Sequence, residues 1–273
     1  MTLPPGTILQ RMYVAERLRA LTPGSFVEVG TGEGWLAKTL LDSGWRGTGY
    51  EPAAAAAARA EAQLAPEINE GRFRLERRDW LTADAPGSEV DLVVSAMVLE
   101  HLAPEREREY FRQAARYLRP GGRALLLVPA SPTHWGIEDD VAGHYRRYTP
   151  QSMRQLLALV GWDAGHVAGL TYPLSNLLLP LSNRLVRRSE GHRRALSLAE
   201  RTAASGSRDV ALKTRFPATL GLVLNEYALA PWHWWQKASR DHPHALVLYV
   251  ECWPLRAPTV ASACAGGHGR ERA

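Results

Sequence analysis

The sequence predicts an α/β fold: a seven-stranded, mostly parallel sheet with helices on both faces, and a helical cap inserted before the last strand. Short apolar runs rich in β-forming residues alternate with segments of helical periodicity, which is the pattern of a parallel sheet. The runs at 90–94 and 124–128 are apolar almost throughout, as expected of strands that are buried on both sides. A long irregular segment then separates the last two predicted strands.

The predicted elements follow one another in a regular order. An amphipathic helix at 7–20 ends before Pro23-Gly24. The expected strands are 25–29, 46–50, 72–77, 90–96, 123–129, 162–168 and 245–251. The expected helices between them are 34–42, 53–65, 104–118 and 150–160. We expect Pro66 to stop the alanine-rich helix, and Arg119-Pro120-Gly121-Gly122 to form a turn before the fifth strand.

This pattern divides the chain into five parts. They are an N-terminal helix over the predicted ligand site (1–24), the α/β core (25–168), a cap that shapes a second pocket (169–244), the closing strand (245–255) and a tail (256–273). The tail consists mainly of alanine, glycine and charged residues, and we expect it to be disordered because it has little to bury.

Composition indicates a soluble globular protein in a reducing, cytoplasmic compartment. Of its 273 residues 45% are hydrophobic and 22% charged, and the two cysteines, Cys252 and Cys264, have no metal-binding spacing and no disulfide framework. We see no N-terminal signal and no apolar run of roughly 20 residues. The net charge is +5, and the excess of basic residues is concentrated between 182 and 216, a range that contains nine basic and three acidic residues.

The most informative segment is Phe26-Val27-Glu28-Val29-Gly30-Thr31-Gly32-Glu33-Gly34, in which a strand leads through three alternate glycines into a helix. Glycines let backbone N–H groups approach a nucleotide-like ligand without a Cβ in the way. A dinucleotide fold requires Gly-x-Gly-x-x-Gly, but here the third glycine comes one residue early and Trp35 occupies its place. No Gly-Lys-Ser/Thr follows, which argues against a phosphate-binding P-loop.

The segment resembles motif I of the class I S-adenosylmethionine (SAM) dependent methyltransferases, in particular the type 11 and type 23 enzymes that modify small molecules. The resemblance covers about residues 25–168 and the closing strand, and Leu118-Arg119-Pro120-Gly121-Gly122 is a further hallmark. It implies a Rossmann-like sheet with SAM as cofactor. The implied cofactor residues are Glu28, Gly30, Thr31, Gly32, Gly34, Glu51, Asp79, Trp80, Ser95 and Met97.

Each of these residues has an implied role. The glycine turn places backbone amides near the methionine and ribose of SAM, Glu28 accepts from the α-ammonium side, and two carboxylate oxygens of Glu51 suit two ribose hydroxyls. Asp79 takes the adenine amino group and Trp80 packs against the ring, while the fourth strand ends near the sulfonium. Alternatives stay open: Glu51 could cap the alanine-rich helix, and Asp79 could be a solvated residue paired to Arg77 or Arg78.

The acceptor site is expected at the carboxyl ends of the strands, where open α/β sheets bind ligands. His144, in Gly-His-Tyr-Arg-Arg-Tyr, is the leading base or acceptor-orienting residue, and His101 is a second catalytic candidate. The expected substrate-binding residues are His134, Tyr145, Arg146, Arg147 and Tyr172. Alternatively His144 has a structural role and Arg146 pairs with Glu138 or Asp139. We expect no metal, because the consecutive carboxylates 138–140 point different ways.

We therefore expect a methyltransferase that modifies a small-molecule, lipid-linked or sugar-linked acceptor, most readily at oxygen. A nucleic-acid methyltransferase is disfavoured because no Asp/Asn-Pro-Pro-Tyr/Phe string follows the fourth strand. A further alternative is a non-catalytic subunit with the same fold that meets a membrane surface through 174–186, beside the basic stretch. A peripheral membrane contact is compatible both with a methyltransferase and with a non-catalytic subunit. The sequence leaves the oligomeric state open.

Overall fold

The computed structural model describes residues 2–84, 89–198, 200–201, 210 and 216–255. These residues form a seven-stranded sheet in the order β3-β2-β1-β4-β5-β7-β6, in which only β7 runs antiparallel to its neighbours. The strands are β1 (Ser25–Val29), β2 (Arg46–Tyr50), β3 (Phe73–Glu76), β4 (Val90–Ala96), β5 (Leu118–Pro129), β6 (Trp162–Leu170) and β7 (Val247–Pro254). The strand order reverses between β1 and β4, and a crevice for ligands is expected at the carboxyl ends there.

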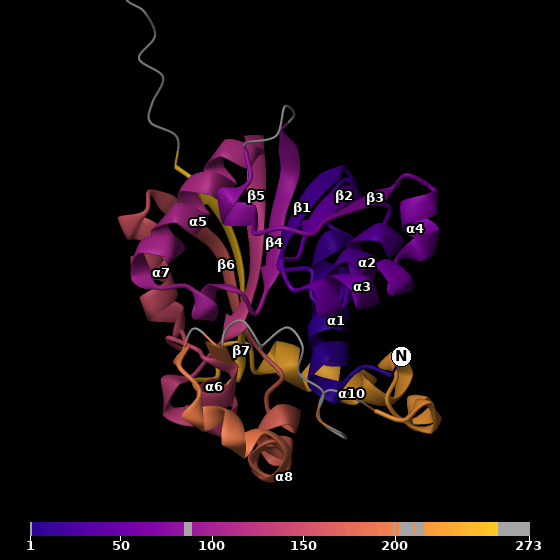
Figure 1. The fold of residues 1–273 in the computed structure, drawn as a ribbon, viewed down its shortest axis with the longest axis vertical. Helices are drawn as coiled ribbons and strands as arrows, with labels where there is room; N and C mark the ends of the chain where they lie inside the picture. Colours follow the sequence, from indigo (N-terminus) through magenta and orange to yellow (C-terminus); the bar gives the residue numbers. More distant parts are fainter. Residues whose placement is uncertain (1, 85–88, 199, 202–209, 211–215, 256–273) are drawn as a thin grey trace, which may run out of the picture.

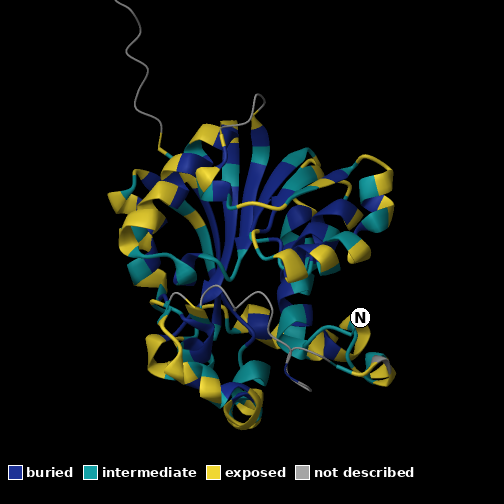
Figure 2. Ribbon diagram, viewed as in Figure 1, coloured by how far each residue is buried: buried dark blue, intermediate teal, exposed yellow. Residues whose placement is uncertain are grey.

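Helices cover both faces of this sheet (Figure 1). On one face α1 (Pro5–Leu18) and α2 (Trp35–Asp42) pack on β-strand side chains such as Phe26 and Leu92. On the other face α5 (Pro104–Tyr117) and α7 (Pro150–Leu159) bury Tyr110 and Met153 against the sheet. The strands are buried between these two layers, as Figure 2 shows, which explains why the runs 90–94 of β4 and 124–128 of β5 are apolar almost throughout.

Two short predictions about turns need correction. Pro66 does not only end the alanine-rich helix: α3 (Ala54–Gln63) stops before it, and α4 (Ala65–Asn69) begins with Pro66 in its first turn. Proline is tolerated there because the first helical N–H groups have no intrahelical acceptor. The fifth strand begins at Leu118 rather than at 123, and the expected turn is an irregularity inside it, since the partner of Val90 is Leu118 while that of Leu92 is Arg123.

Short helices gather at the carboxyl edge of the sheet. They are η1 (Trp80–Thr82), η2 (Leu99–His101), η3 (Pro132–His134) and α6 (Ile137–Ala142). The described part of the 169–244 segment lies at this edge too (Figure 1). It consists of α8 (Leu174–Glu190), η4 (Gly191–Ala195), η5 (Ala218–Leu222) and α10 (Glu226–Ala238). This part of the chain therefore stands over the strand ends where the sequence predicts the chemistry.

A buried glutamine holds α10 onto the rest of the fold. Gln236 donates to the carbonyl of Leu9 at 2.9 Å, and its side-chain oxygen accepts from the backbone N–H of Thr171 at 2.9 Å. Leu229 adds an apolar contact with Ile8 and Leu9 of α1. The predicted tail at 256–273 lies outside the described residues, as do Arg208, Lys213 and Arg215 of the basic stretch. Among the described residues, no helix combines the length and apolar character that crossing a bilayer requires.

Candidate functional site

The glycine turn after β1 has the backbone conformation that its composition predicts. Gly30, Gly32 and Gly34 all have positive φ angles, of 72°, 57° and 87°. An L side chain rarely adopts this conformation. A Cβ on Gly30 would lie 2.6 Å from Val98, whereas a Cβ on Gly32 would meet nothing within 4 Å. Open space therefore lies directly against the Gly32 backbone, where the sequence places the cofactor.

Glu51 joins this turn to the end of β2. The side chain is buried, one carboxylate oxygen accepts from the backbone N–H of Gly32 at 2.8 Å, and the other accepts from Ala53 at 2.9 Å. The second contact is at the residue before α3, so the predicted capping role and the predicted ribose role involve the same carboxylate. Each oxygen retains a further lone pair, and two oxygens with free lone pairs suit the vicinal hydroxyls of a ribose.

Glu28, which lies beside the turn, has a carboxylate oxygen without a hydrogen-bond partner among the described residues. Its side chain is buried, and this oxygen is Oε2. Burial, and next the negative charge of Glu51, raise the pKa of Glu28 well above its ordinary value. A cationic group placed here would satisfy the carboxylate, and the α-ammonium of SAM is such a group. The residues of the turn thus fit SAM on three independent features: the open space at Gly32, the oxygens of Glu51 and the unpaired oxygen of Glu28.

Asp79 lies at the end of β3 with its carboxylate half exposed. Its Oδ1 accepts from Leu81 N–H at 3.0 Å, which starts η1, and its Oδ2 pairs with Arg106 at 2.7 Å. The alternative partners considered from the sequence, Arg77 and Arg78, pair with other carboxylates instead. The exposed position leaves Asp79 accessible to an adenine amino group, so that role stays a prediction.

Two of the predicted cofactor contacts need correction. The Trp80 ring is 1% exposed and packs between Tyr110 and Tyr117, with 5.2 Å between ring centroids on each side. Ser95 is also buried, and its hydroxyl accepts from Tyr110 at 2.9 Å. Both side chains belong to the core under α5, so neither offers a surface to adenine or to the sulfonium. Met97, with a positive φ of 57°, remains at the edge just beyond β4.

On the acceptor side, His144 is held by a buried carboxylate. Its Nδ1 lies 2.9 Å from Oδ1 of Asp139, and the same oxygen accepts a hydrogen bond from Arg147 at 2.7 Å. The other oxygen of Asp139, Oδ2, accepts from the backbone N–H of Gly136 at 2.8 Å. Burial alone would raise the pKa of Asp139, but the hydrogen bonds from His144 and Arg147 outweigh it and lower the pKa. With Nδ1 as the donor, the lone pair of His144 is on Nε2.

Glu100 lies opposite this lone pair. It is fully buried, its Oε1 is 4.0 Å from Nε2 of His144, and neither carboxylate oxygen has a hydrogen-bond partner in the part of the chain described. Burial raises the pKa of Glu100 to about 7. The ring of His101 meets that of His144 edge to face, with 4.8 Å between centroids. The two predicted catalytic histidines are therefore brought together, along with a glutamate that the sequence did not single out.

The two arginines of the predicted substrate set have separate partners. Arg146 pairs with Glu107 at 2.8 Å, and not with Glu138 or Asp139 as the sequence allowed. The side chain of Arg147 is only 7% exposed and pairs with Asp139, so it supports His144 and offers little surface to a substrate. Tyr145 is exposed, and its backbone N–H donates to the carbonyl of Glu100 at 2.7 Å.

His134 and Tyr172 belong to a cluster of rings that the sequence only half predicts. The rings of Tyr172 and His242 stack with 3.8 Å between their centroids. The ring centroid of His244 lies 5.2 Å from that of His134 and 5.5 Å from that of His242. Burial, and then the positive charges of His244 and Arg147, lower the pKa of His134. The signal for the two additional histidines was His-Pro-His just before the closing strand, at the edge where ligands are expected.

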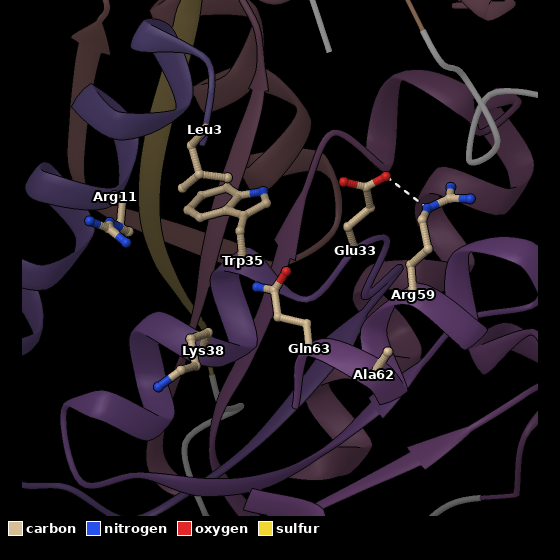
Figure 3. A pocket seen from close by; sticks show the side chains of 8 residues that line it. All are labelled: Leu3, Arg11, Glu33, Trp35, Lys38, Arg59, Ala62 and Gln63. Carbon is tan, nitrogen blue, oxygen red and sulfur yellow. Dashed lines mark ion pairs between the residues drawn. The ribbon is translucent and has the colours of Figure 1, made fainter. Parts of the chain in front are cut away.

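A separate pocket of about 520 Å³ lies between α1, the glycine turn and α3 (Figure 3). Glu33 is the residue of the turn that lines it, and its carboxylate pairs with Arg59 at 2.8 Å. Arg11 and Lys38 also pair with carboxylates of the chain. None of the predicted cofactor residues lines this pocket, whose lining is Leu3, Arg11, Glu33, Trp35, Lys38, Arg59, Ala62 and Gln63.

Comparison with known proteins identifies the same stretch of chain. A family model described as a methyltransferase domain matches residues 8–167. An uncharacterized methyltransferase of Bacillus subtilis (strain 168), YrrT, is 34% identical over 92 residues, which are 34% of this chain and 41% of the relative. Another, GK2543 of Geobacillus kaustophilus (strain HTA426), is 30% identical over 104 residues, 38% of this chain and 46% of the relative. The match thus spans less than half the length of either relative.

Solved structures share the fold. The 1,6-didemethyltoxoflavin-N1-methyltransferase of Burkholderia thailandensis, solved with S-adenosylhomocysteine, matches with a TM-score of 0.50 and 21% identity over 60% of this chain and 72% of its own. Magnesium protoporphyrin IX methyltransferase from Synechocystis PCC 6803, also with S-adenosylhomocysteine, matches with a TM-score of 0.51 and 17% identity over 61% of this chain and 77% of its own. At these identities the likeness concerns the fold alone.

Proposed function

The chain belongs to the methyltransferase-domain family, class I enzymes that use SAM, and we propose that it methylates an oxygen of a small-molecule, lipid-linked or sugar-linked acceptor. SAM supplies a methyl group that is already activated by positive sulfur. The task of the protein is to align the acceptor with that methyl group and to exclude water. Glu28, Gly32 and Glu51 are the residues we propose for holding SAM, with Asp79 at the adenine end.

One observation carries the choice of oxygen as the acceptor atom: Asp139 holds Nδ1 of His144 and leaves the Nε2 lone pair on the side of Glu100, just after the end of β4. A hydroxyl must lose its proton when it is methylated, whereas a neutral amine attacks with a lone pair it already has. A histidine in this arrangement is suited to orient a hydroxyl and to assist the loss of its proton. We therefore propose His144 as the acceptor-activating residue and His101 as its neighbour in the acceptor pocket.

The proposed function predicts a labelled O-methyl product. We expect incubation of the full chain with methyl-labelled SAM and fractionated metabolites to label a hydroxyl-bearing compound, identified by mass spectrometry. Boiled protein and Glu51→Ala protein are the controls. Label only on nitrogen would overturn the choice of oxygen, and label in nucleic acid would favour the nucleic-acid alternative. A folded protein that binds SAM but labels no fraction would support the non-catalytic alternative.

The described cap residues favour an acceptor that is presented at a membrane. On α10, Tyr227 and Trp234 lie on the face opposite the buried Leu229 and Gln236 and are 93% and 72% exposed. On α8, exposed Leu177 and Leu181 continue at helical spacing into Arg184 and Arg188. We propose that α8 and α10 turn these six exposed side chains, from Tyr227, Trp234, Leu177, Leu181, Arg184 and Arg188, toward the same membrane, and we call them the cap face. Aromatic, leucine and arginine side chains together are typical of surfaces that rest on anionic bilayers.

The cap face predicts binding to anionic vesicles. We expect the protein to sediment with vesicles of phosphatidylcholine containing phosphatidylglycerol, and less so at high salt because the arginine attraction is screened. Tyr227→Ala/Trp234→Ala should reduce the bound fraction several-fold. Leu159→Ala is the matched control, since Leu159 is 79% exposed on α7, outside the cap. Protein that stays in the supernatant with these vesicles, or a double variant that binds like the wild type, would contradict the membrane role.

A further inference from the structure

Three side chains that ligate metals in other proteins converge at the carboxyl end of β4. Glu100 and His101 end η2, directly after the strand, and His144 follows α6 on the next strand's loop. One ligand atom from each lies within 4.8 Å of those of the other two. The cluster lies at the edge of the sheet where ligands bind in open α/β folds. It contains one carboxylate and two imidazoles.

The carboxylate of Glu100 is the part of this cluster that lacks hydrogen-bond partners among the described residues. The side chain is fully buried, and both of its oxygens lack such a partner. Nε2 of His144 is 4.0 Å from Oε1, which is too long for a hydrogen bond. The nearby arginine, Arg147, bonds to Asp139 instead. Burying a carboxylate without a partner is costly, so a group that is absent from the chain itself would satisfy it.

His144 is oriented as a metal ligand would be. Its Nδ1 bonds to Asp139 at 2.9 Å, and the lone pair on Nε2 faces Glu100. Histidines that ligate metals regularly donate their other nitrogen to a carboxylate, which fixes both the tautomer and the ring orientation. Asp139 is itself fixed by Arg147 and by the backbone of Gly136. Hydrogen bonds therefore fix both the ring of His144 and the carboxylate that orients it.

We propose that Glu100, His101 and His144 bind a divalent first-row transition-metal ion such as Zn²⁺. Two imidazoles and one carboxylate suit such ions, whereas Mg²⁺ and Ca²⁺ prefer oxygen ligands. With bonds of about 2.1 Å, tetrahedral ligand atoms stand about 3.4 Å apart. The three side chains therefore draw together by roughly an ångström when the ion binds. Three protein ligands leave a fourth position open.

The open position gives the ion a use that rests on the proposed function. A hydroxyl beside the ion has a lowered pKa and releases its proton to solvent. The oxygen then forms its bond to the methyl carbon as the carbon–sulfur bond breaks, and the bonding pair leaves with sulfur. In this arrangement Nε2 of His144 is a ligand and does not take the proton. The binding of the ion itself needs neither SAM nor an acceptor.

Calorimetric titration of the chelator-stripped full chain with Zn²⁺, in the absence of SAM, tests the site. We expect one equivalent to bind, and Glu100→Gln, His101→Gln and His144→Gln each to weaken binding at least about tenfold. His233→Gln is the matched control, because His233 also bonds to a carboxylate, Glu16 at 3.0 Å, but lies on α10. Zinc should also raise the melting temperature of the wild type and His233→Gln more than that of the three cluster variants.

Two outcomes would overturn the site: a wild type that binds no zinc, or cluster variants that bind it as the wild type does. His101 is only partly buried, so His101→Gln should fold even if a change at Glu100 does not. Chelation then separates binding from use. Methyl transfer that is lost with chelator and restored by zinc supports the catalytic use. Transfer that chelator leaves unchanged refutes that use and returns Nε2 of His144 to the role of proton acceptor.

Discussion

Replacing Glu51 with alanine is expected to abolish SAM binding that calorimetry can measure. The carboxylate is buried and holds the backbone N–H of Gly32, so its loss both loosens the glycine turn and removes the acceptors for the ribose hydroxyls. Hydrogen bonds to a charged group contribute about 1.5–3 kcal/mol each. Losing two of them corresponds to an affinity at least about 100-fold weaker.

Gly32→Val should have an effect of similar size for a different reason. Gly32 has a φ of 57°, and a side chain there would project into the space in which we place the cofactor. Gly71→Val is the matched control, since Gly71 has a φ of 69° and a Cβ added to it would also meet nothing within 4 Å, but it lies before β3. Both variants carry the same backbone strain. Only the Gly32 variant should lose SAM.

A folded Glu51→Ala protein that binds SAM with the wild-type affinity would contradict the assignment of the turn. So would equal losses of affinity in the Gly32 and Gly71 variants, because strain alone would then explain both. Circular dichroism and the melting temperature establish that each variant is folded before it is titrated. The comparison of the two glycines separates the shape of the site from the stability of the fold.

The sequence predicted the strands of this fold better than it predicted which side chains reach the site. The limits of β1 and β4 are as expected, because a strand buried on both faces is mostly apolar and rich in β-branched residues. Trp80 and Ser95 were predicted to contact the cofactor because they follow or end strands, but the structure buries both side chains in the core. Successive side chains of a strand point to opposite faces, so a shift of one residue decides whether Ser95 belongs to the site or to the core. Trp80 lies in η1, and its burial follows from packing against Tyr110 and Tyr117 of α5.

Other contacts could not be predicted because they join distant parts of the chain. Tyr172 stacks on His242, which lies at the opposite end of the 169–244 segment. Fully buried Glu100 meets the loop after β5 through His144 and the backbone of Tyr145, and nothing in Leu99-Glu100-His101 signals this locally. Arg146 pairs with Glu107 on α5 rather than with the nearer acids at 138–140. Pattern and spacing identify elements, whereas packing between elements decides these partners.

The second large effect is expected at His144. His144→Ala should lower the rate of methyl transfer by about 10²–10⁴-fold, the range expected for loss of a group that assists proton removal. SAM affinity should stay within about twofold of the wild type, because the contacts of His144 are with Asp139, Glu100 and His101 and not with the glycine turn. Rates with the acceptor found by labelling, together with calorimetry for SAM, check both expectations. His233→Gln again serves as the control.

The dependence on the acceptor distinguishes activation from mere packing. If His144 assists proton loss, directly or as a ligand of a metal ion, the rate penalty in His144→Ala should shrink as the acceptor hydroxyl becomes more acidic, because a more acidic hydroxyl needs less help. If His144 only packs against His101, every acceptor should lose the same factor. A series of acceptor analogues that differ in hydroxyl acidity but not in shape therefore decides the role. An equal loss across that series would refute acceptor activation by His144 even if the average rate fell as expected.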